Sequence, residues 1–173
     1  MESAIIGGGC FWCTEGVLRG LKGIIEVVPG YCGGNVVNPT YEQVCGKKTG
    51  HAEVVKIIFN SDIISFKTVL QIFFTSHDPT QLNRQGNDIG PQYRSIAFYD
   101  NEEQKNDIEL VISGLEKIFS NKIVTEISPM MDFYIAEKYH HDYYALNSSQ
   151  PYCTMVIAPK IRKVREKYLN LYK

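Results

Sequence analysis

The chain has 173 residues, of which 44% are apolar and 21% are charged, and its formal net charge at pH 7 is −1. This length predicts one domain with a single substantial core, spanning residues 1–173. The balanced charge gives no reason to expect nucleic acid or an acidic membrane as a partner, and no segment approaches the roughly 20 apolar residues that span a bilayer.

The first predicted elements surround three glycines and a cysteine. An apolar run at residues 4–6 leads into the glycines, and a helix is predicted from Phe11 to about Gly20 or Gly23. Cys10 then stands at the helix N-terminus, where unpaired backbone N–H groups and the helix dipole favour an anion. For a cysteine that anion is the thiolate, so the pattern predicts a lowered pKa and a nucleophilic Cys10.

Two strands, a helical turn and a longer helix follow. Strands are predicted over Gly23–Tyr31 and Val54–Phe59, and the second is β-branched and continuous enough to be a buried central strand. Thr40 can cap a helical turn over residues 41–45. Ser65 can begin a helix that ends before His77.

A polar stretch, Thr80–Arg94, has almost no apolar periodicity, which indicates a functional loop or disorder. A strand is predicted over residues 95–99. A capping box at Asp100–Glu103 predicts the start of an amphipathic helix that extends to Phe119. Residues 123–128 alternate between apolar and polar side chains, as a half-exposed strand would.

The C-terminal part is predicted to contain a helix over Ala136–Leu146, a short closing strand over Met155–Ile157 and an amphipathic final helix over residues 161–171. Strands and helices alternate without a strict βαβ period, and no internal repeat is present. The sequence therefore predicts one α/β or α+β two-layer sandwich, with helices on a mixed or mainly antiparallel sheet.

The five cysteines are spread over the chain. This odd number favours reduced thiols in a cytoplasmic protein over secreted disulfides, and no secretory signal is expected. Cys10 and Cys13 are two thiols one helical turn apart, a common redox spacing because such a pair can close a disulfide. The alternatives are a zinc half-site and two buried thiols, but structural zinc usually needs a second Cys/His pair at ligand spacing. His140 and His141 are neighbours that point apart, so no metal site is predicted.

Glu53 enters the apolar strand at its beginning. An ionised carboxylate is costly to bury there, so its pKa should rise, and this suits a general acid. The alternative is a solvent-facing glutamate at a strand end. The triple glycine does not predict a dinucleotide site, because Trp12 stands where that fingerprint needs a glycine.

Seven stretches of the chain carry a pattern when they are taken together: GCFW at 9–12, GYCGG at 30–34, NPTYEQVC at 38–45, TGHAEVVKI at 49–57, HDPTQLNRQGNDIGPQYRS at 77–95, YIAEKYHHDYY at 134–144 and QPYC at 150–153. In these stretches the sequence resembles the A-type peptide methionine sulfoxide reductases. The resemblance covers nearly the whole chain, in the family's order, and implies a ferredoxin-like α/β sandwich core with long active-site loops. It also implies reduction of methionine S-sulfoxide, in proteins and free, without a metal or organic cofactor.

Under this resemblance, Cys10 attacks the sulfoxide sulfur and becomes a sulfenic acid, while Glu53 protonates the sulfoxide oxygen. The other implied roles are hydrogen bonds to that oxygen from Tyr41 and Tyr93, ordering of the site by Asp88, and a pocket for the S-methyl group formed by Phe11 and Trp12.

The resolving thiol is where this sequence departs from the commoner family pattern, because many members of the family resolve with cysteines in a C-terminal glycine-rich tail. Here position 13 is a cysteine and the chain ends in a basic helix, so Cys13 is favoured and Cys153 is the alternative. The resulting disulfide would be reduced by thioredoxin or a dithiol. Cys32 and Cys45 have no predicted redox role, and a monomer is expected.

Two other functions are weighed against this one. A general thiol–disulfide oxidoreductase would use the two cysteines alone, but it leaves Glu53, Tyr41 and Tyr93 without a task. A non-catalytic zinc or redox-sensing module would need a metal or a second thiol pair.

Overall fold

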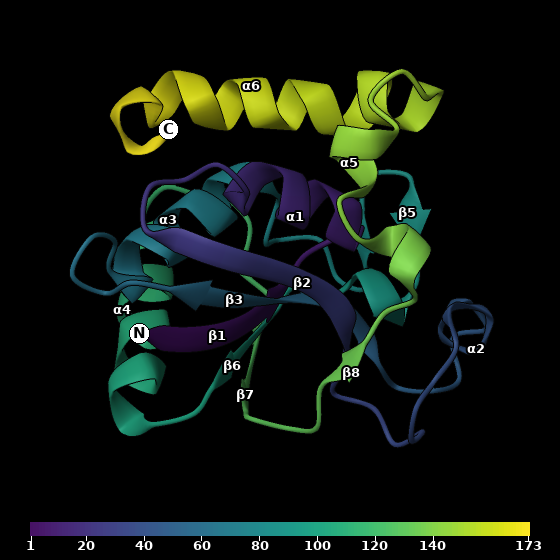
Figure 1. Cartoon of the computed structure of the whole chain (residues 1–173). Coiled ribbons are helices and arrows are strands. Elements are labelled where there is room, and N and C mark those ends of the chain that lie inside the picture. Colours follow the sequence, from purple (N-terminus) through teal and green to yellow (C-terminus); the bar gives the residue numbers. More distant parts are fainter.

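The structure is a computed structural model that describes residues 1–173, and a six-stranded sheet forms its centre (Figure 1). The strand order is β7-β6-β1-β3-β2-β8, and every neighbouring pair is antiparallel except β6 and β7. This mixed, mainly antiparallel sheet with helices packed on it confirms the predicted sandwich. The six strands are β1 (Glu2–Gly7), β2 (Ile24–Cys32), β3 (Ala52–Phe59), β6 (Ile96–Tyr99), β7 (Glu126–Pro129) and β8 (Tyr134–Ile135).

Four of these strands and two helices, α1 (Phe11–Leu18) and α3 (Phe66–Ser76), form the ferredoxin-like core. Helix α1 connects β1 to β2, and α3 connects β3 to β6. The order β6-β1-β3-β2 therefore interleaves the two halves of the core. Strands β7 and β8 extend this core at its two edges.

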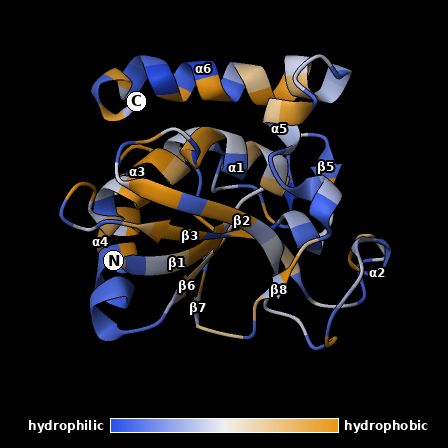
Figure 2. Ribbon diagram, in the orientation of Figure 1, coloured by the Kyte–Doolittle hydropathy of each residue, from blue (hydrophilic) through white to orange (hydrophobic).

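Strand β3 is the buried central strand that its composition predicts. Val54, Val55, Ile57 and Phe59 are fully buried, and β-branched side chains suit a pleated surface that is covered on both faces. One face of the sheet packs against α1 and α3, while the other lies under the chain around Phe133. Hydrophobic residues are accordingly concentrated along the strands and α3 (Figure 2).

Helix starts follow the predicted caps at two positions and differ at a third. The side chains of Thr40 and Ser65 accept backbone hydrogen bonds at the starts of α2 (Tyr41–Cys45) and α3. The box predicted at Asp100 and Glu103 is wrong, because α4 (Glu102–Leu115) is capped by Asn101. Helix α4 also ends at Leu115, so the apolar spacing that continues to residue 119 is not helical.

Two C-terminal predictions are wrong. The segment predicted as one helix over Ala136–Leu146 contains a 3₁₀ turn and the short helix α5, and they are separated by Asp142, whose φ of 56° is left-handed. The strand predicted over Met155–Ile157 is instead part of a π-helical turn that continues into α6. The elements concerned are η2 (Lys138–His140), α5 (Tyr143–Leu146), η3 (Cys153–Ile157), α6 (Ala158–Lys167) and η4 (Leu169–Leu171).

The long polar loop contains the hairpin β4–β5 and a 3₁₀ turn, and it lies, as α2, α5 and β8 do, towards the end of the sheet where β1 stops and β3 begins (Figure 1). None of the helices has the length and apolar character required to cross a membrane. The loop elements are β4 (Arg84–Gln85), β5 (Asp88–Ile89) and η1 (Pro91–Tyr93).

Candidate active site

Cys10 lies between the end of β1 and the first turn of α1, as predicted. It is the N-cap residue of α1, and its side chain is 8% exposed. The turn before it needs glycine, because Gly9 has a φ of 85° and a Cβ on Gly7 would lie 2.4 Å from the carbonyl oxygen of Glu53. The Gly9 N–H donates to the Tyr93 carbonyl oxygen at 3.1 Å. This turn is thus held against both β3 and η1.

The predicted lowering of the Cys10 pKa is wrong. Burial raises the pKa of the thiol well above its ordinary value, and the Glu53 carboxylate and the Cys13 thiolate raise it further. The backbone N–H of Trp12 acts in the opposite direction but is the smaller effect. The stabilisation of the thiolate by the helix N-terminus is therefore smaller than its destabilisation by burial, and the resting side chain of Cys10 is a protonated thiol.

Glu53 lies beside this thiol and is 1% exposed. Its Oε1 accepts a hydrogen bond from the Phe11 N–H at 3.1 Å. Burial raises the pKa of Glu53 to about 8, and the Asp88 carboxylate adds to the rise, although the bond from Phe11 opposes it. The predicted rise is confirmed. Near neutral pH, a neutral carboxylic acid and a neutral thiol share one buried space.

Two tyrosines approach the same space from different segments. Tyr41 opens α2, and its backbone N–H donates to Glu137 Oε2 at 2.9 Å, while Tyr93 closes η1. Burial raises the pKa of both phenols, and the Glu53 charge raises each of them further. Both side chains are therefore protonated donors close enough to Glu53 to respond to its charge.

Phe11 and Trp12 differ in their exposure. Phe11 is fully buried, with ring centroids 5.7 Å from Tyr31 and 4.9 Å from His140. Trp12 is half-buried, and its ring stacks on Tyr143 at 3.6 Å with an interplanar angle of 6°. Phe11 thus supplies a fixed apolar wall, whereas Trp12 presents part of its surface outside the core.

His140 holds Trp12 in this orientation and was not predicted. Its Nδ1 accepts a hydrogen bond from Trp12 Nε1–H at 3.0 Å, which places the proton of a neutral ring on Nε2. Burial lowers the pKa of His140 to about 4, so the ring is neutral near pH 7. The Nε2 atom is buried without a hydrogen-bond partner.

Glu15 anchors the segment that carries these aromatic rings. It is 2% exposed, and its two oxygens accept hydrogen bonds from the backbone N–H groups of Asp142 and Tyr143 at 3.1 and 3.2 Å. Helix α1 therefore presents Trp12 and, one turn later, fixes the tyrosine that stacks on it. The clustered aromatics and histidines of residues 139–144 are the signal that could have indicated this contact.

The two candidate partner thiols have different relations to Cys10. All five cysteines are free, and Cys13 and Cys153 are both buried. The Cys13 N–H donates to the Cys10 carbonyl oxygen at 3.1 Å, and the Cys13 charge raises the Cys10 pKa. Cys153 lies in η3, and burial alone raises its pKa. Of the two, Cys13 thus has a direct backbone contact with Cys10.

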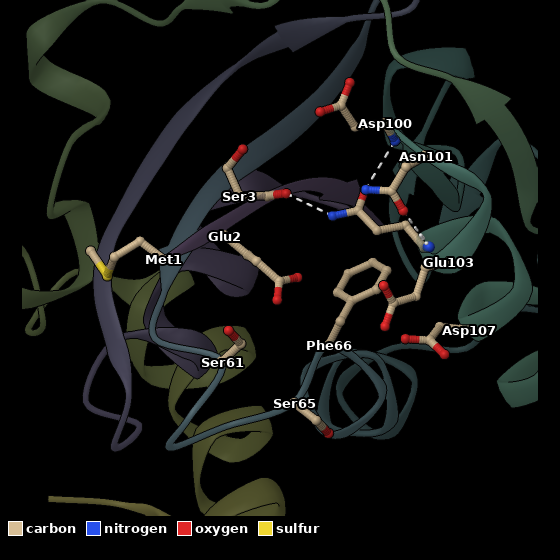
Figure 3. Close-up of a pocket in the computed structure, with 11 residues that line it drawn as sticks. Met1, Glu2, Ser3, Ser61, Ser65, Phe66, Asp100, Asn101, Glu103 and Asp107 are labelled. Carbon is tan, nitrogen blue, oxygen red and sulfur yellow. Dashed lines mark hydrogen bonds between the residues drawn. The ribbon is translucent and has the colours of Figure 1, made fainter.

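A separate hollow of about 490 Å³ lies at the other end of β1, between Glu2 and the start of α4 (Figure 3). Acidic side chains including Glu103 and Asp107 line it. No group of three or more His, Cys, Asp or Glu residues in the chain is arranged to hold a metal ion. The hollow is remote from Cys10, because the length of β1 separates the two.

Comparison with known proteins agrees with this geometry. A family model described as peptide methionine sulfoxide reductase matches residues 2–172. The Saccharolobus solfataricus protein named peptide methionine sulfoxide reductase MsrA is 58% identical over 163 residues, which cover 94% of this chain and 92% of that protein. The reduced form of Mxr1 from Saccharomyces cerevisiae gives a TM-score of 0.83 at 32% identity and covers 88% of each chain. Mxr1 in complex with Trx2 gives a TM-score of 0.59 at 23% identity, covering 82% of this chain and 84% of that one.

Proposed function

The chain belongs to the peptide methionine sulfoxide reductase family, and from this premise we propose how its own residues carry out the reaction. The enzyme is a thiol-dependent oxidoreductase that reduces methionine sulfoxide to methionine. We propose that residues 1–173 act as one catalytic domain on the S epimer, both within proteins and as the free amino acid. The observation that carries the proposal is the buried, protonatable Glu53 beside the Cys10 thiol.

Cys10 is the nucleophile and Glu53 the general acid. The Cys10 sulfur attacks the sulfoxide sulfur while Glu53 gives its proton to the sulfoxide oxygen. This attack forms a bond between the Cys10 sulfur and the substrate sulfur. The hydroxyl group then passes from the substrate sulfur to the Cys10 sulfur as that sulfur–sulfur bond breaks, so Cys10 becomes a sulfenic acid and methionine leaves. Glu53 then takes up the proton that the Cys10 thiol loses. Thiol and sulfoxide thus give sulfenic acid and sulfide, with no proton left over.

Tyr41, Tyr93 and Asp88 support this step. The raised pKa values of the two phenols keep them protonated, so both can donate hydrogen bonds to the sulfoxide oxygen as negative charge develops on it. The Asp88 charge contributes to the raised pKa of Glu53 and so helps to keep the acid protonated. Asp88 thus helps to order the site through the effect of its charge on Glu53.

Phe11 and Trp12 would hold the S-methyl group. Phe11 provides a buried apolar wall, and the half-buried Trp12 is braced by Tyr143 and His140. A methyl group bound between such rings leaves the polar sulfoxide oxygen on the side of the phenols. The opposite epimer would exchange these two groups, which is the physical basis for proposing selectivity for the S form.

Cys13 would resolve the sulfenic acid by closing a disulfide with Cys10. It lies one helical turn away and influences the Cys10 pKa, whereas Cys153 shows no such link. The disulfide would be reduced by a thioredoxin-type partner, as Mxr1 has been solved in complex with Trx2.

This thiol chemistry requires no metal or organic cofactor. Five free cysteines suit a reducing cytoplasm, and we propose a monomer that binds neither nucleic acid nor membrane.

A single turnover without reductant tests the function. Reduced protein should convert the S epimer to about one methionine per chain, because oxidation of one Cys10–Cys13 thiol pair to the disulfide supplies the two electrons that one sulfoxide needs. The R epimer is the matched control and should give none. Methionine is measured by chromatography of each quenched mixture, and equal yields from both epimers would contradict the proposed pocket.

The resolving thiol is tested by two serine variants. Cys13→Ser should still form one methionine per chain, but Cys10 should stay a sulfenic acid that reacts with dimedone, and thioredoxin should no longer sustain turnover. Cys153→Ser should close the disulfide and recycle as the parent does. If Cys13→Ser closes a disulfide and recycles while Cys153→Ser does not, Cys153 is the resolving residue.

A further inference from the structure

A short chain of hydrogen bonds connects Cys13 to a carboxylate through Tyr152, a residue to which sequence analysis assigned no role. The Cys13 sulfur lies 3.8 Å from the Tyr152 hydroxyl oxygen. That hydroxyl donates to Asp88 Oδ2 at 2.7 Å. Three segments that are far apart in the chain, α1, β5 and the residue before η3, therefore meet along one line from thiol to carboxylate.

The direction of both hydrogen bonds follows from the number of protons that the carboxylate and the tyrosine hydroxyl can donate. An ionised carboxylate can only accept, and a tyrosine hydroxyl has one proton to donate. Because the Tyr152 proton points to Asp88, its oxygen is left as the acceptor for the Cys13 S–H. The Cys13 proton thus points to the Tyr152 oxygen, and the Tyr152 proton points to the Asp88 carboxylate.

We propose that Tyr152 and Asp88 form a proton relay that takes the thiol proton of Cys13 when Cys13 closes the disulfide with Cys10. This inference rests on the proposed role of Cys13 as the resolving thiol. It makes Tyr152 a catalytic residue of the second half-reaction, because its oxygen touches the thiol that reacts. Asp88 becomes the base for that step, in addition to its effect on Glu53.

Cys13 needs such help because it reacts from inside the protein. It is 3% exposed, and burial raises the pKa of its thiol. Lys160 on α6 lowers this pKa, whereas Asp88 on β5 and Glu53 on β3 raise it. These opposing charges leave the thiol protonated at rest. A buried thiol without a base within reach would form the reactive thiolate only rarely.

The ring of Tyr152 is held in place for this task. It meets Trp12 edge to face, with ring centroids 5.8 Å apart and an interplanar angle of 78°. The same tryptophan stacks on Tyr143 and donates to His140. The hydroxyl therefore cannot leave Asp88 without disturbing a packed aromatic cluster, so the relay is organised before the sulfenic acid forms.

The step is balanced in atoms and electrons. Cys13 gives its proton to the Tyr152 oxygen as Tyr152 gives its own to Asp88, and the Cys13 sulfur forms a bond to the Cys10 sulfur. The sulfur–oxygen bond of the sulfenic acid breaks, and the departing hydroxide takes the proton from Asp88 and leaves as water. Cys13 is oxidised and Cys10 is reduced from sulfenic acid to disulfide, with Tyr152 and Asp88 restored.

The test measures disulfide closure separately from methionine formation. A single turnover of the S epimer is quenched at intervals, and sulfenic acid is trapped with dimedone while disulfide is counted by mass. Tyr152→Phe should slow closure about tenfold or more, within the range of lost general-base catalysis. Its residual closure should rise about tenfold per pH unit from pH 7 to 9, because hydroxide must then remove the proton. Asp88→Asn keeps an acceptor for the Tyr152 hydroxyl but cannot take its proton, so it should slow closure as well.

Tyr172→Phe is the matched control. It removes a buried tyrosine hydroxyl that donates to the Val17 carbonyl oxygen at 2.7 Å, near the other end of α1, and should close the disulfide at the parental rate. Parental closure in both Tyr152→Phe and Asp88→Asn would overturn the relay while leaving Cys13 as the resolver. Disulfide closure in Cys13→Ser would instead overturn the proposed function of Cys13, so the two failures are distinguishable.

Discussion

Cys10→Ser is expected to form no measurable methionine from either epimer of methionine sulfoxide. The serine hydroxyl has a far higher pKa than the thiol, and it has no sulfur that could accept the oxygen as a sulfenic acid, so both the attack and the acceptance of oxygen are lost. We expect the rate to fall by at least about 10⁴-fold, the scale on which removal of a nucleophile is felt. Chromatographic measurement of methionine in a single turnover gives the result directly.

The matched control for this variant is Cys32→Ser. Cys32 is also fully buried, and its thiol donates to the Met131 carbonyl oxygen at 3.6 Å. A serine hydroxyl can make the same hydrogen bond, so methionine formation should match that of the parent. Methionine formed by Cys10→Ser at a rate close to that of Cys32→Ser would show that the nucleophile is elsewhere.

Glu53→Gln is expected to lower the rate of methionine formation by about 10² to 10⁴-fold, the usual contribution of general acid–base catalysis. The amide oxygen can still accept from the Phe11 N–H, and its NH₂ group can still donate to the sulfoxide oxygen. It cannot deliver a proton. The variant should therefore keep substrate binding while losing most of the rate, which separate measurements of kcat and KM will show.

The same substitution should change the pH dependence of the rate. The parental rate should fall as pH rises through about 8, because Glu53 loses the proton that it delivers. Glu53→Gln should lack that fall. Glu26→Gln changes an exposed glutamate on β2 and should retain both the parental rate and the parental profile. An unaltered fall in Glu53→Gln would assign the titration to another group.

The Glu53→Gln substitution should raise stability although it lowers activity. The folded pKa of Glu53 is about 8 against an ordinary value of 4.5, so its contribution to stability is present in full below pH 4.5 and is lost as pH rises to 8. At 1.36 kcal/mol per pKa unit, glutamine should be more stable than glutamate at pH 8 by up to about 4 kcal/mol. Denaturant unfolding at pH 5 and pH 8 measures this difference, which should shrink to about 1 kcal/mol or less at the lower pH.

Much of the fold follows from local patterns, and the failures occur where tertiary contacts decide. The buried strand around Val54–Phe59 was predicted because its β-branched run is unambiguous. The three apolar residues Met155–Ile157 were read as a strand, but so short a run has no period that distinguishes strand from helix. The helix predicted over Ala136–Leu146 is broken because Asp142 adopts a left-handed φ, with its N–H bonded to Glu15.

The candidate site was predicted more completely in its residues than in its electrostatics. The positions of Cys10 and Glu53, and the raised pKa of the glutamate, follow from a glycine turn and an apolar strand. The Cys10 pKa was predicted with the wrong sign, because the helix dipole is a local property whereas burial depends on the whole fold. Tyr152 could not be placed, since its contact with Cys13 crosses 139 residues of chain.

The contacts made by Trp12, Glu15 and Cys13 join the beginning of the chain to its last third, across 127 or more residues. Closing so long a loop costs only about 2 kcal/mol more than closing one of ten residues, because this entropy grows with the logarithm of length. The large separation instead affects the order of folding, because contacts between residues far apart in the sequence form late. Cys10 and Glu53 can meet as soon as β1 and β3 pair, but Trp12 and Cys13 have no partners until the C-terminal segment docks. Local unfolding of that segment would therefore disable the site while the sheet stays intact.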